Sequence, residues 1–419
     1  MVQPSGIHSR RAALQMLDAV LRRGETLEQA EHSALRSVRK PADRGLALAI
    51  ANESLRWQTD FDAMIDSATK QRLPDDARQR MVLRMMLAQT LRLETPSHAV
   101  IATALPLLAG GPRRLAHGVF STLIKREAAL PEAPSLPGPV MERWGARAEA
   151  IAPGLVDPPP LDLTLRDASE TQAMAVQLAA DSLAPGHLRL ARGEAIEKIA
   201  GFSEGKWWVQ DLAASLPARL LGKGTHESGS KHVLDLCAAP GGKTLQLAAN
   251  GWNVTALDLS KRRLGLLKEN LERTGLKASP LRADALIWEP KHLYDAILLD
   301  APCTATGTCR RHPDVLHRIG PDQIEEMVKL QRGLVERAAT WLKPGGVLIY
   351  AVCSLEHEEG ENQAEWINAN CDLAPLAITA GELPAGLQPT AEGWLRTHPG
   401  LLADEGGLDS FFVARWQKA

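Results

Sequence analysis

From residue 232 onward, the chain alternates apolar strand-like runs with amphipathic helical stretches. HVLDLC, NVTALDL, YDAILLD and GGVLIYAVCS are expected strands, and KTLQLAAN, KRRLGLLKENLERTG and PDQIEEMVKLQRGLVERAATWL are expected helices. YDAILLD is an almost continuous apolar run, as in a strand buried on both faces, and SFFVARW is expected to complete an edge. Strands that alternate with helices predict a parallel, doubly wound sheet, which binds its ligands beyond the carboxyl ends of its strands.

The chain before this sheet divides into two further parts. Residues 8–129 carry apolar side chains at helical spacing, as in DDARQRMVLRMMLAQTLRLE, where the arginines are expected outside the apolar stripe and Asp43 and Asp75 are expected N-caps. Prolines then cluster, and from residue 161 the expected strands LDLTLRD and HLRLARG alternate with helices, KWWVQD leads into a further helix, and a polar linker, THESGSKH, follows. We therefore expect a helical domain over 1–138, a linker and small α/β module over 139–225, and an α/β domain over 226–419.

Composition excludes several classes of protein. Of the 419 residues, 45% are hydrophobic and 23% are charged, which indicates folded domains and not a disordered, collagen-like or coiled-coil chain. No apolar run approaches the roughly 20 residues of a membrane span, and MVQPSGIHSRR lacks the apolar core of a signal peptide. We therefore expect a cytoplasmic protein without a membrane partner.

The five cysteines are sparse and odd in number: Cys237, Cys303, Cys309, Cys353 and Cys371. This usage fits a reducing compartment and excludes a disulfide scaffold. No two of them form a CxxC pair, so we expect no structural zinc and no other metal.

The net charge of −2 is the sum of a basic N-terminal part and an acidic remainder of the chain. Residues 1–130 hold 19 basic and 13 acidic residues, whereas the remainder holds 29 basic and 37 acidic residues. A basic front end points weakly to a nucleic-acid partner, and a solvated helical surface is the alternative.

The turn in VLDLCAAPGGKT is the candidate cofactor site. A Gly-rich turn between a strand and a helix lets the backbone approach a ligand, but a P-loop would need glycine at Cys237, and GxGxxG is absent. Asp258, after the next strand, could accept both ribose hydroxyls, and Asp284, after the presumed third strand, could hold an adenine amino group. The alternative is that these aspartates only cap helices.

Two cysteines follow two expected strands, in Asp300-Ala301-Pro302-Cys303 and at Cys353. If these strands are neighbours, both thiols face one cleft beside the cofactor turn. A thiolate that adds to carbon 6 of cytosine makes carbon 5 nucleophilic toward a methyl sulfonium, and a base then removes the carbon 5 proton. Asp300 could hydrogen-bond the ring, while Lys243 or Arg311 could lower a thiol pKa. Buried cysteines are usually unreactive packing residues. This interpretation applies well to Cys371 and moderately to Cys237 and Cys309.

The motifs DLCAAPGGKT, LLDAPCTATGT followed by RRHPD, and AVCSLEHEEGENQ resemble the Sun/Nop family of RNA cytosine-5 methyltransferases over about residues 141–419. RGLALAIANESLRW and HGVFSTLIKRE resemble, less specifically, the NusB-type RNA-binding domain. The resemblance implies a multidomain α and α/β protein: an all-helical NusB-like domain, a small mixed α/β module and a C-terminal Rossmann-like class I methyltransferase sheet. TATGT departs from the Ser-Gly element usual in the family, and Cys309 replaces an aliphatic residue.

The resemblance also implies roles for individual residues. Cys353 would be the nucleophile and Cys303 would assist product release, in an order that the residues alone leave open. S-adenosyl-L-methionine would be surrounded by Cys237, Ala238, Ala239, Pro240, Gly241, Gly242, Lys243, Asp258, Arg263, Asp284 and Asp300. Alternatively, Arg262 and Arg263 pair with the helix surface.

The expected partner is small-subunit (16S) ribosomal RNA, bound by a monomer. Aromatic residues form only 4% of the chain, so arginine–phosphate contacts are favoured over base stacking. The candidates near the cleft are Arg310, Arg311 and His312, and those in the front end are Arg10, Arg11, Arg22 and Arg23. A transfer RNA substrate and a non-catalytic ribosome-assembly factor remain the alternative functions.

Overall fold

The computed structural model describes residues 6–193, 195–226 and 229–419, which form two compact units. The helical unit extends to Asp157 and also contains Cys309–Ile319, and the sheet unit comprises Pro158–Thr308 and Gly320–Ala419. The segment 139–225, expected to be one linker and module, is divided between the two units after Asp157. Among the described residues, no helix is both long and apolar enough to cross a membrane.

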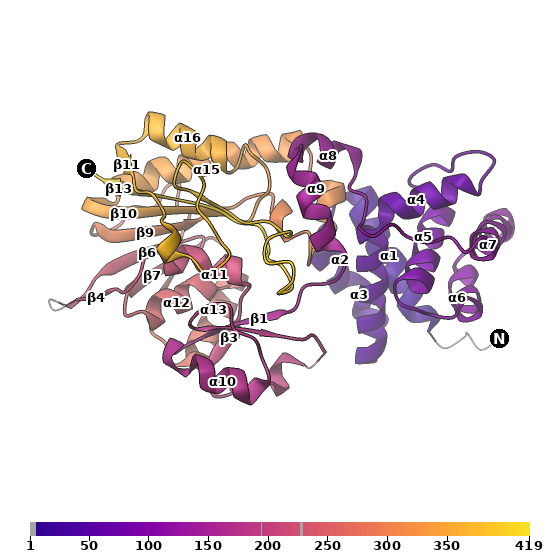
Figure 1. Ribbon diagram of the computed structural model, residues 1–419, viewed down its shortest axis with the longest axis horizontal. Helices are drawn as coiled ribbons and strands as arrows, with labels where there is room; N and C mark the ends of the chain where they lie inside the picture. The colour runs from indigo at the N-terminus through magenta and orange to yellow at the C-terminus, as the bar shows by residue number, and fades with distance from the viewer. Residues whose placement is uncertain (1–5, 194, 227–228) are drawn as a thin grey trace. The chain divides into compact units, whose positions relative to one another are not determined.

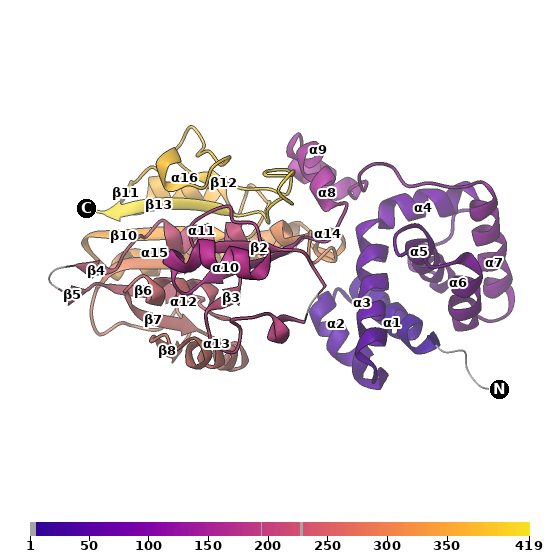
Figure 2. The same cartoon turned by 60° about the horizontal axis from the view of Figure 1, so that its bottom comes forward.

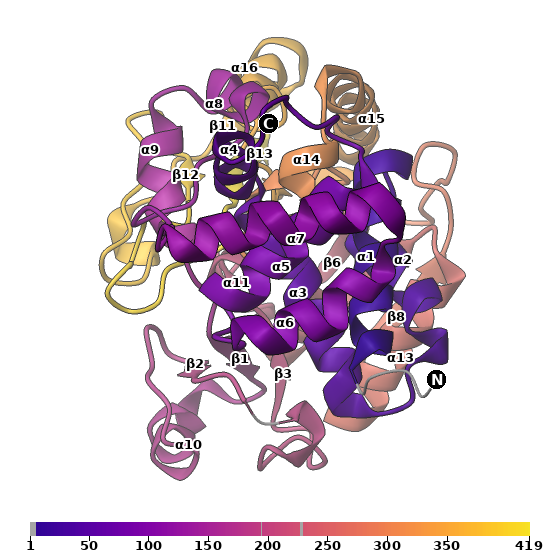
Figure 3. The ribbon, with the colours of Figure 1, turned by 90° about the vertical axis from the view of Figure 1, so that its right-hand side faces the viewer.

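The helical unit has no strand in its described residues, in agreement with the helical periodicity of the sequence. Its core is made by apolar side chains from α1 to α7, and Figure 3 shows α7 in the foreground with α5 behind it. The helices are α1 (Ile7–Arg23), α2 (Leu27–Ala34), α3 (Pro41–Arg56), α4 (Gln58–Ser67), α5 (Arg78–Leu91), α6 (Ser97–Ala104), α7 (Gly110–Lys125), α8 (Gly138–Trp144), α9 (Arg147–Ile151) and α14 (Val315–Arg318).

The two expected N-caps are wrong. Helix α3 begins at Pro41, whose fixed φ suits the first helical position, so Asp43 lies within the first turn. Helix α5 begins at Arg78, and Asp75 instead pairs with Arg72 at 2.8 Å.

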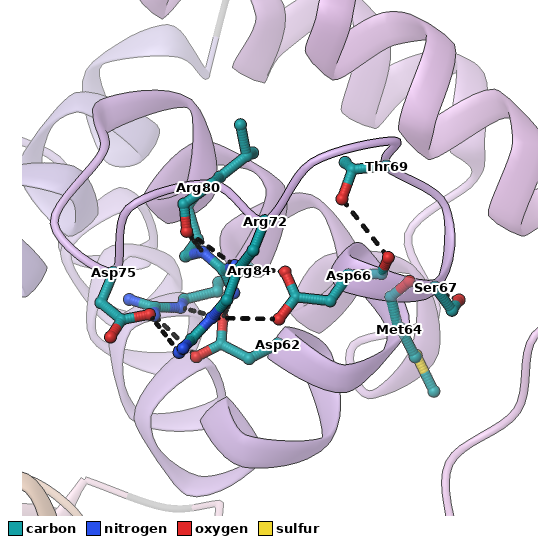
Figure 4. Close-up of polar contacts among 10 residues, drawn as sticks. Asp62, Met64, Asp66, Ser67, Thr69, Arg72, Asp75, Arg80 and Arg84 are labelled. Carbon is teal, nitrogen blue, oxygen red and sulfur yellow. Dashed lines mark hydrogen bonds and ion pairs between the residues drawn. The ribbon is translucent and has the colours of Figure 1, made fainter.

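Two arginines of α5 are buried, contrary to the expectation that its arginines lie outside the apolar stripe. Arg80 and Arg84 are 0% and 1% exposed. Asp62 of α4 accepts two hydrogen bonds from Arg84, at 2.8 and 2.7 Å, and lies 2.9 Å from Arg80 Nη1 (Figure 4). Arg80 also pairs with Asp66. Buried guanidinium groups need such partners, and two aspartates one helical turn apart supply them.

The second segment of the helical unit is held by buried polar contacts. Arg56 donates one hydrogen bond to the carbonyl oxygen of Arg310, at 2.8 Å, and another to that of Leu155, at 2.9 Å. His317 Nε2 lies 2.7 Å from the carbonyl oxygen of Leu55, and burial lowers the pKa of His317 to about 4, so its imidazole is neutral and donates. A stretch of chain that follows Thr308 directly is therefore packed as part of the helical unit.

The sheet unit contains a small antiparallel sheet in the order β2-β1-β3 and a large sheet in the order β11-β13-β10-β9-β6-β7-β8, with β12 pairing β13. Figure 2 shows the large sheet with α13 along its β7–β8 side. The elements are β1 (Leu161–Leu165), α10 (Thr171–Leu178), β2 (His187–Leu190), β3 (Trp207–Val209), α11 (Leu212–Arg219), β4 (Thr225–His226), β5 (Gly229–Ser230), β6 (His232–Leu236), α12 (Gly242–Ala249), β7 (Asn253–Asp258), α13 (Lys261–Thr274), β8 (Ser279–Arg282), β9 (Tyr294–Asp300), α15 (Pro321–Thr340), β10 (Leu342–Val352), α16 (Glu361–Asn370), β11 (Leu373–Pro375), β12 (Leu395–Arg396) and β13 (Phe412–Lys418).

The expected doubly wound sheet is confirmed: β10, β9, β6, β7 and β8 pair in parallel. Two details differ from expectation. The SFFVARW strand, β13, lies antiparallel between β10 and β11, so the short strand β11 is the edge. Within the expected THESGSKH linker, β4 pairs with β5 and His232 already begins β6, while residues 227 and 228 lie outside the described residues.

The apolar run in β9 is explained by helices on both faces of the sheet. Ile297 and Leu299 pack in the core that includes α15 and α16, whereas Ala296 and Leu298 pack in the core that includes α12 and α13. Figure 1 shows these two layers of helices on either side of the sheet. Because successive side chains point to opposite faces, a strand covered on both sides must be apolar throughout.

Candidate active site

The cofactor turn lies between the carboxyl end of β6 and the start of α12, as the sequence predicts. Its backbone is left-handed at Cys237, with φ 60°, and at Gly241, with φ 113°. A Cβ atom on Gly241 would overlap with Leu267 Cδ1 of α13. Glycine is therefore favoured at position 241 by its φ, and any side chain there would also require Leu267 to move.

Asp258, at the end of β7, contacts the cofactor turn directly. Its Oδ2 accepts a hydrogen bond from Ala239 N at 3.1 Å, and its Oδ1 accepts one from Ser260 N at 2.8 Å. Arg263 lies 3.5 Å from the same carboxylate and donates to the carbonyl oxygen of Ala239. Ser260 is the N-cap of α13, so the reading of Asp258 as a simple helix cap is wrong.

Asp284 makes only local contacts among those that the structure describes. Its side chain accepts a hydrogen bond from Leu286 N at 3.0 Å, and its carbonyl oxygen accepts bonds from Ile287 N and Trp288 N. These contacts form a turn after β8, and the capping interpretation therefore stays open for this residue.

Lys243 and Asp300 form an ion pair of 2.8 Å in which the lysine is 8% exposed. Its ammonium group also lies 5.0 Å from the centre of the Phe411 ring. The buried Lys243 side chain thus contacts both the carboxylate at the end of β9 and an aromatic ring.

Asp235, in β6, is a buried acid that the sequence analysis did not single out. One of its carboxylate oxygens accepts a hydrogen bond from Thr244 Oγ1 at 2.5 Å, and the other has no hydrogen-bond partner among the described residues. Burial raises the pKa of Asp235 to about 7 and that of the Cys237 thiol to about 12. Cys237 is therefore an uncharged thiol at neutral pH.

The structure brings the two predicted active-site cysteines together. Strands β9 and β10 are parallel neighbours, with Ala351 opposite Asp300, so the loops that follow them start side by side. The Sγ atoms of Cys303 and Cys353 lie 3.5 Å apart. The hydrogen bond between the thiols, together with burial, raises the pKa of Cys303 well above its usual range, so Cys303 stays protonated.

A buried carboxylate, which the sequence analysis missed, connects the two cysteine loops. Glu359 accepts hydrogen bonds from Thr304 N at 2.9 Å, from Ser354 Oγ at 2.5 Å and from the Thr304 hydroxyl. Burial raises the pKa of Glu359. The sequence feature that could have indicated such a carboxylate is the hydroxyl residue directly after each of the two cysteines, Thr304 and Ser354. Buried hydroxyl groups on two neighbouring loops need a hydrogen-bond acceptor, and one carboxylate can serve both.

The TATGT loop also packs tightly against the end of β10. Gly307 N donates to the carbonyl oxygen of Cys353 at 3.0 Å, and a Cβ on Gly307 would lie 2.6 Å from the carbonyl oxygen of Ser410. Thr306 Oγ1 accepts from Leu355 N at 3.0 Å. The departure from the expected Ser-Gly element therefore still fixes the loop against Cys353.

The expected RNA contacts do not all reach the surface. Arg310, Arg311 and His312 belong to the helical unit; Arg310 is 3% exposed, Arg311 is half-buried and His312 is exposed. Arg10 is 6% exposed and donates to Gln89 at 2.7 Å. Burial of Arg310 and Arg10 argues against phosphate contacts by these two side chains.

The other front-end candidates are exposed. Arg11 is exposed, and Arg22 and Arg23 both pair with Asp18. In the described parts of the chain, no group of three or more His, Cys, Asp or Glu side chains is arranged to hold a metal ion.

Comparison with known proteins assigns both regions of the chain to families. The family model described as 16S rRNA methyltransferase RsmB/F matches residues 225–417, and that of the NusB family matches residues 7–109. The chain is 31% identical over 443 residues to "Ribosomal RNA small subunit methyltransferase B" of Xanthomonas campestris, covering 99% of this chain and 98% of that protein.

Two solved structures share the fold of about two thirds of this chain. One is a methyltransferase homologue from Pyrococcus horikoshii, with a TM-score of 0.56 and 27% identity, covering 67% of this chain and 93% of that chain. Another is NSun6 from Pyrococcus horikoshii with SFG, with a TM-score of 0.57 and 19% identity, covering 67% and 98%. The chain therefore belongs to the RsmB/F family of 16S rRNA methyltransferases and carries an N-terminal region of the NusB family.

Proposed function

We propose that this chain transfers a methyl group from S-adenosyl-L-methionine to carbon 5 of a cytosine in 16S ribosomal RNA, through a covalent adduct between a cysteine and carbon 6 of the base. The single observation that carries the proposal is the 3.5 Å separation of the Cys303 and Cys353 Sγ atoms, at the ends of neighbouring strands. A pair of thiols at that edge of the sheet is a nucleophile with a neighbouring proton donor or acceptor.

The residues around the β6–α12 turn fit S-adenosylmethionine. The unpartnered buried oxygen of Asp235 lies on the strand that leads into the turn, where a donor or a positive charge would satisfy it. Asp258 keeps acceptor capacity for ribose hydroxyls beyond its two backbone hydrogen bonds, and Asp284 and Asp300 follow β8 and β9. When bound, the cofactor supplies an electrophilic methyl group.

Cys353 is the proposed nucleophile. Its sulfur forms a bond to carbon 6 of the base, and the electron pair of the 5,6 double bond becomes available at carbon 5. Cys303, whose raised pKa keeps it protonated, donates its S–H toward Cys353 and so stabilises the attacking thiolate. Once carbon 5 is methylated, a base takes the carbon 5 proton, the sulfur–carbon bond breaks and the thiolate of Cys353 is restored. We propose that Cys303 assists this release.

Asp300 is proposed to hydrogen-bond the base at N3 or at the exocyclic amino group. The charge on these groups changes when the sulfur of Cys353 adds to carbon 6. Lys243, at 2.8 Å, keeps the Asp300 carboxylate oriented. The target cytosine must leave its stack to reach a site at the end of β9.

The choice of 16S rRNA over transfer RNA rests on the family match and on the NusB-family region. A non-catalytic assembly role is disfavoured, because such a role gives no reason for two thiols in contact. Arg311 and His312 remain proposed phosphate contacts, and a reducing, cytoplasmic location is inferred because oxidation of the thiol pair would remove the nucleophile.

The test is methyl transfer by the full chain to an unmodified 16S rRNA transcript. The expected product is one 5-methylcytosine per transcript, detected by mass spectrometry of nucleosides and located by bisulfite sequencing. Transfer to a transfer RNA transcript but not to 16S rRNA would contradict the substrate, and absence of 5-methylcytosine in either would contradict the chemistry.

A further inference from the structure

Helices α6 and α7 lie in a stretch of 32 residues, 95–126, that contains no Asp or Glu. The same stretch contains Arg113, Arg114, Lys125 and Arg126, all exposed and all on α7 or directly after it. The helical repeat places Lys125 on the face that carries Arg114, because eleven residues are close to three full turns. One long helix of the unit is thus positively charged without compensating acids.

A groove runs between this helix and the chain that follows α4. We call it the α7 groove; it encloses about 660 Å³ and is lined on one side by Thr69, Lys70 and Gln71 and on the other by Arg114, Leu115 and Gly118. Figure 3 shows α7 on the near face of the helical unit. A lysine on one wall and an arginine on the other make the groove positive along both sides.

The positive charges that line the α7 groove, and that of Lys125 further along the same face of α7, are not neutralised by the described residues. Within the described parts of the chain, Lys70, Arg114 and Lys125 form no ion pair, whereas Arg72, two residues after Lys70, pairs with Asp75 at 2.8 Å (Figure 4). Arg22 and Arg23 on α1 are paired in the same way. Exposed cations without carboxylate partners attract polyanions more strongly than ion-paired ones do.

Gly118 leaves the middle of the groove open. It lies inside α7, where glycine is less favourable than alanine, and a Cβ there would meet no atom within 4 Å. The fold therefore gives no steric reason for glycine at this position. The absence of a side chain matters for a partner that must bring its own backbone close to the helix.

We propose that the α7 groove binds the sugar–phosphate backbone of the ribosomal RNA substrate, with Lys70, Arg114 and Lys125 contacting phosphates and Gly118 allowing the strand to approach α7. The inference rests on the proposed function and names the surface through which the helical unit holds that substrate. Phosphates match unpaired cations on both walls, and the apolar side chain of Leu115 suits contact with ribose.

The charge test uses full-length protein and an unmodified 16S rRNA transcript as the probe. The variant Lys70→Ala/Arg114→Ala/Lys125→Ala is compared with Arg36→Ala/Arg39→Ala/Lys40→Ala. The control removes three exposed basic residues of the α2–α3 region that likewise form no ion pair with the described residues. Three lost phosphate contacts are expected to reduce the slope of log Kd against log salt by about 2 and to weaken binding about 100-fold at 0.1 M salt. The control variant is expected to bind as the wild type does.

The steric test leaves the charge unchanged. Gly118→Leu fills the groove, and Gly45→Leu is its matched control, because Gly45 is also an exposed glycine inside a helix with no atom within 4 Å of a Cβ. We expect at least tenfold weaker rRNA binding for Gly118→Leu and none of this loss for Gly45→Leu, with both variants folded by circular dichroism.

Equal rRNA affinity of the groove variants and their controls would overturn the assignment of the groove. Methyl transfer by the wild-type preparation is measured in parallel. If wild-type protein methylates the transcript while the groove variants bind it normally, the groove assignment alone fails. If wild-type protein does not methylate it, the proposed function fails separately.

Discussion

The Sγ atoms of Cys303 and Cys353 lie 3.5 Å apart, although 50 residues separate them in the chain. Parallel pairing of β9 with β10 brings the two loops together, and Glu359 fixes both of them through hydroxyl groups and a backbone amide. The contact is therefore set by strand register and by one buried carboxylate.

The proposed roles predict different fates for the two thiols. With Cys303→Ala, the adduct is expected to form but to be released slowly, because the thiol proposed to assist release is missing. A protein–RNA band that survives a denaturing gel should accumulate when this variant reacts with labelled 16S rRNA and S-adenosylmethionine. Cys353→Ala should give no such band. An adduct formed by Cys353→Ala would reverse the assignment of the nucleophile.

Glu359 is predicted to be a positioning residue. Glu359→Ala would leave the amide of Thr304 and the hydroxyl of Ser354 without their acceptor, which costs about 2–3 kcal/mol of unfolding free energy. Methyl transfer should fall through misplacement of both cysteine loops. Glu359→Gln, which keeps an acceptor, should recover much of the activity.

The control for this prediction is Glu358→Ala, one residue earlier and exposed. Urea unfolding and methyl-transfer rates of the three variants provide the comparison. Equal effects of the substitutions at 358 and 359 would show that the network does not hold the loops.

The buried carboxyl group of Asp235 is expected to make the free energy of unfolding depend on pH. Burial raises its pKa from 3.8 to about 7, so the folded protein retains a proton that the unfolded chain releases above pH 4. The resulting stabilisation is present at low pH and is lost as pH rises through about 7. Between pH 5 and pH 8, the unfolding free energy of the wild type should fall by about 2–3 kcal/mol relative to Asp235→Asn, which does not titrate. Urea unfolding gives this free energy at each pH. If it changed equally in the two proteins between pH 5 and pH 8, the assignment of Asp235 as a buried acid would be contradicted.

Asp62 is predicted to be a major determinant of the stability of the helical unit. Asp62→Ala removes both Arg84 hydrogen bonds and one Arg80 contact, leaving buried guanidinium groups partly unpaired (Figure 4). Breaking a buried pair in this way typically costs about 3–5 kcal/mol. Asp18→Ala breaks only exposed pairs with Arg22 and Arg23 and should cost at most about 1 kcal/mol. The prediction fails if chemical denaturation gives both variants the same loss.

Local sequence patterns determined the helical front end, the parallel sheet and the positions of the cofactor turn and of both cysteine loops. These features follow from side-chain periodicity and from turns that only glycine allows, as at Gly241, and both are properties of neighbouring residues. The sequence also placed Asp258 and Asp300 at strand ends, because parallel strands expose their carboxyl ends at one edge.

Only the tertiary structure decided which polar residues are buried and what they contact. Arginine is a residue type that is usually exposed to solvent. Arg80, Arg84 and Arg10 are nevertheless buried and pair with groups 14 to 79 residues away in the chain. In the same way, Glu359 serves Thr304 across 55 residues, and residues 309–319 pack with helices that precede them by about 250 residues. Periodicity states which face of an element is apolar, but the partner of a buried charge is chosen by long-range packing, because desolvation must be compensated wherever the fold brings a complementary group within reach.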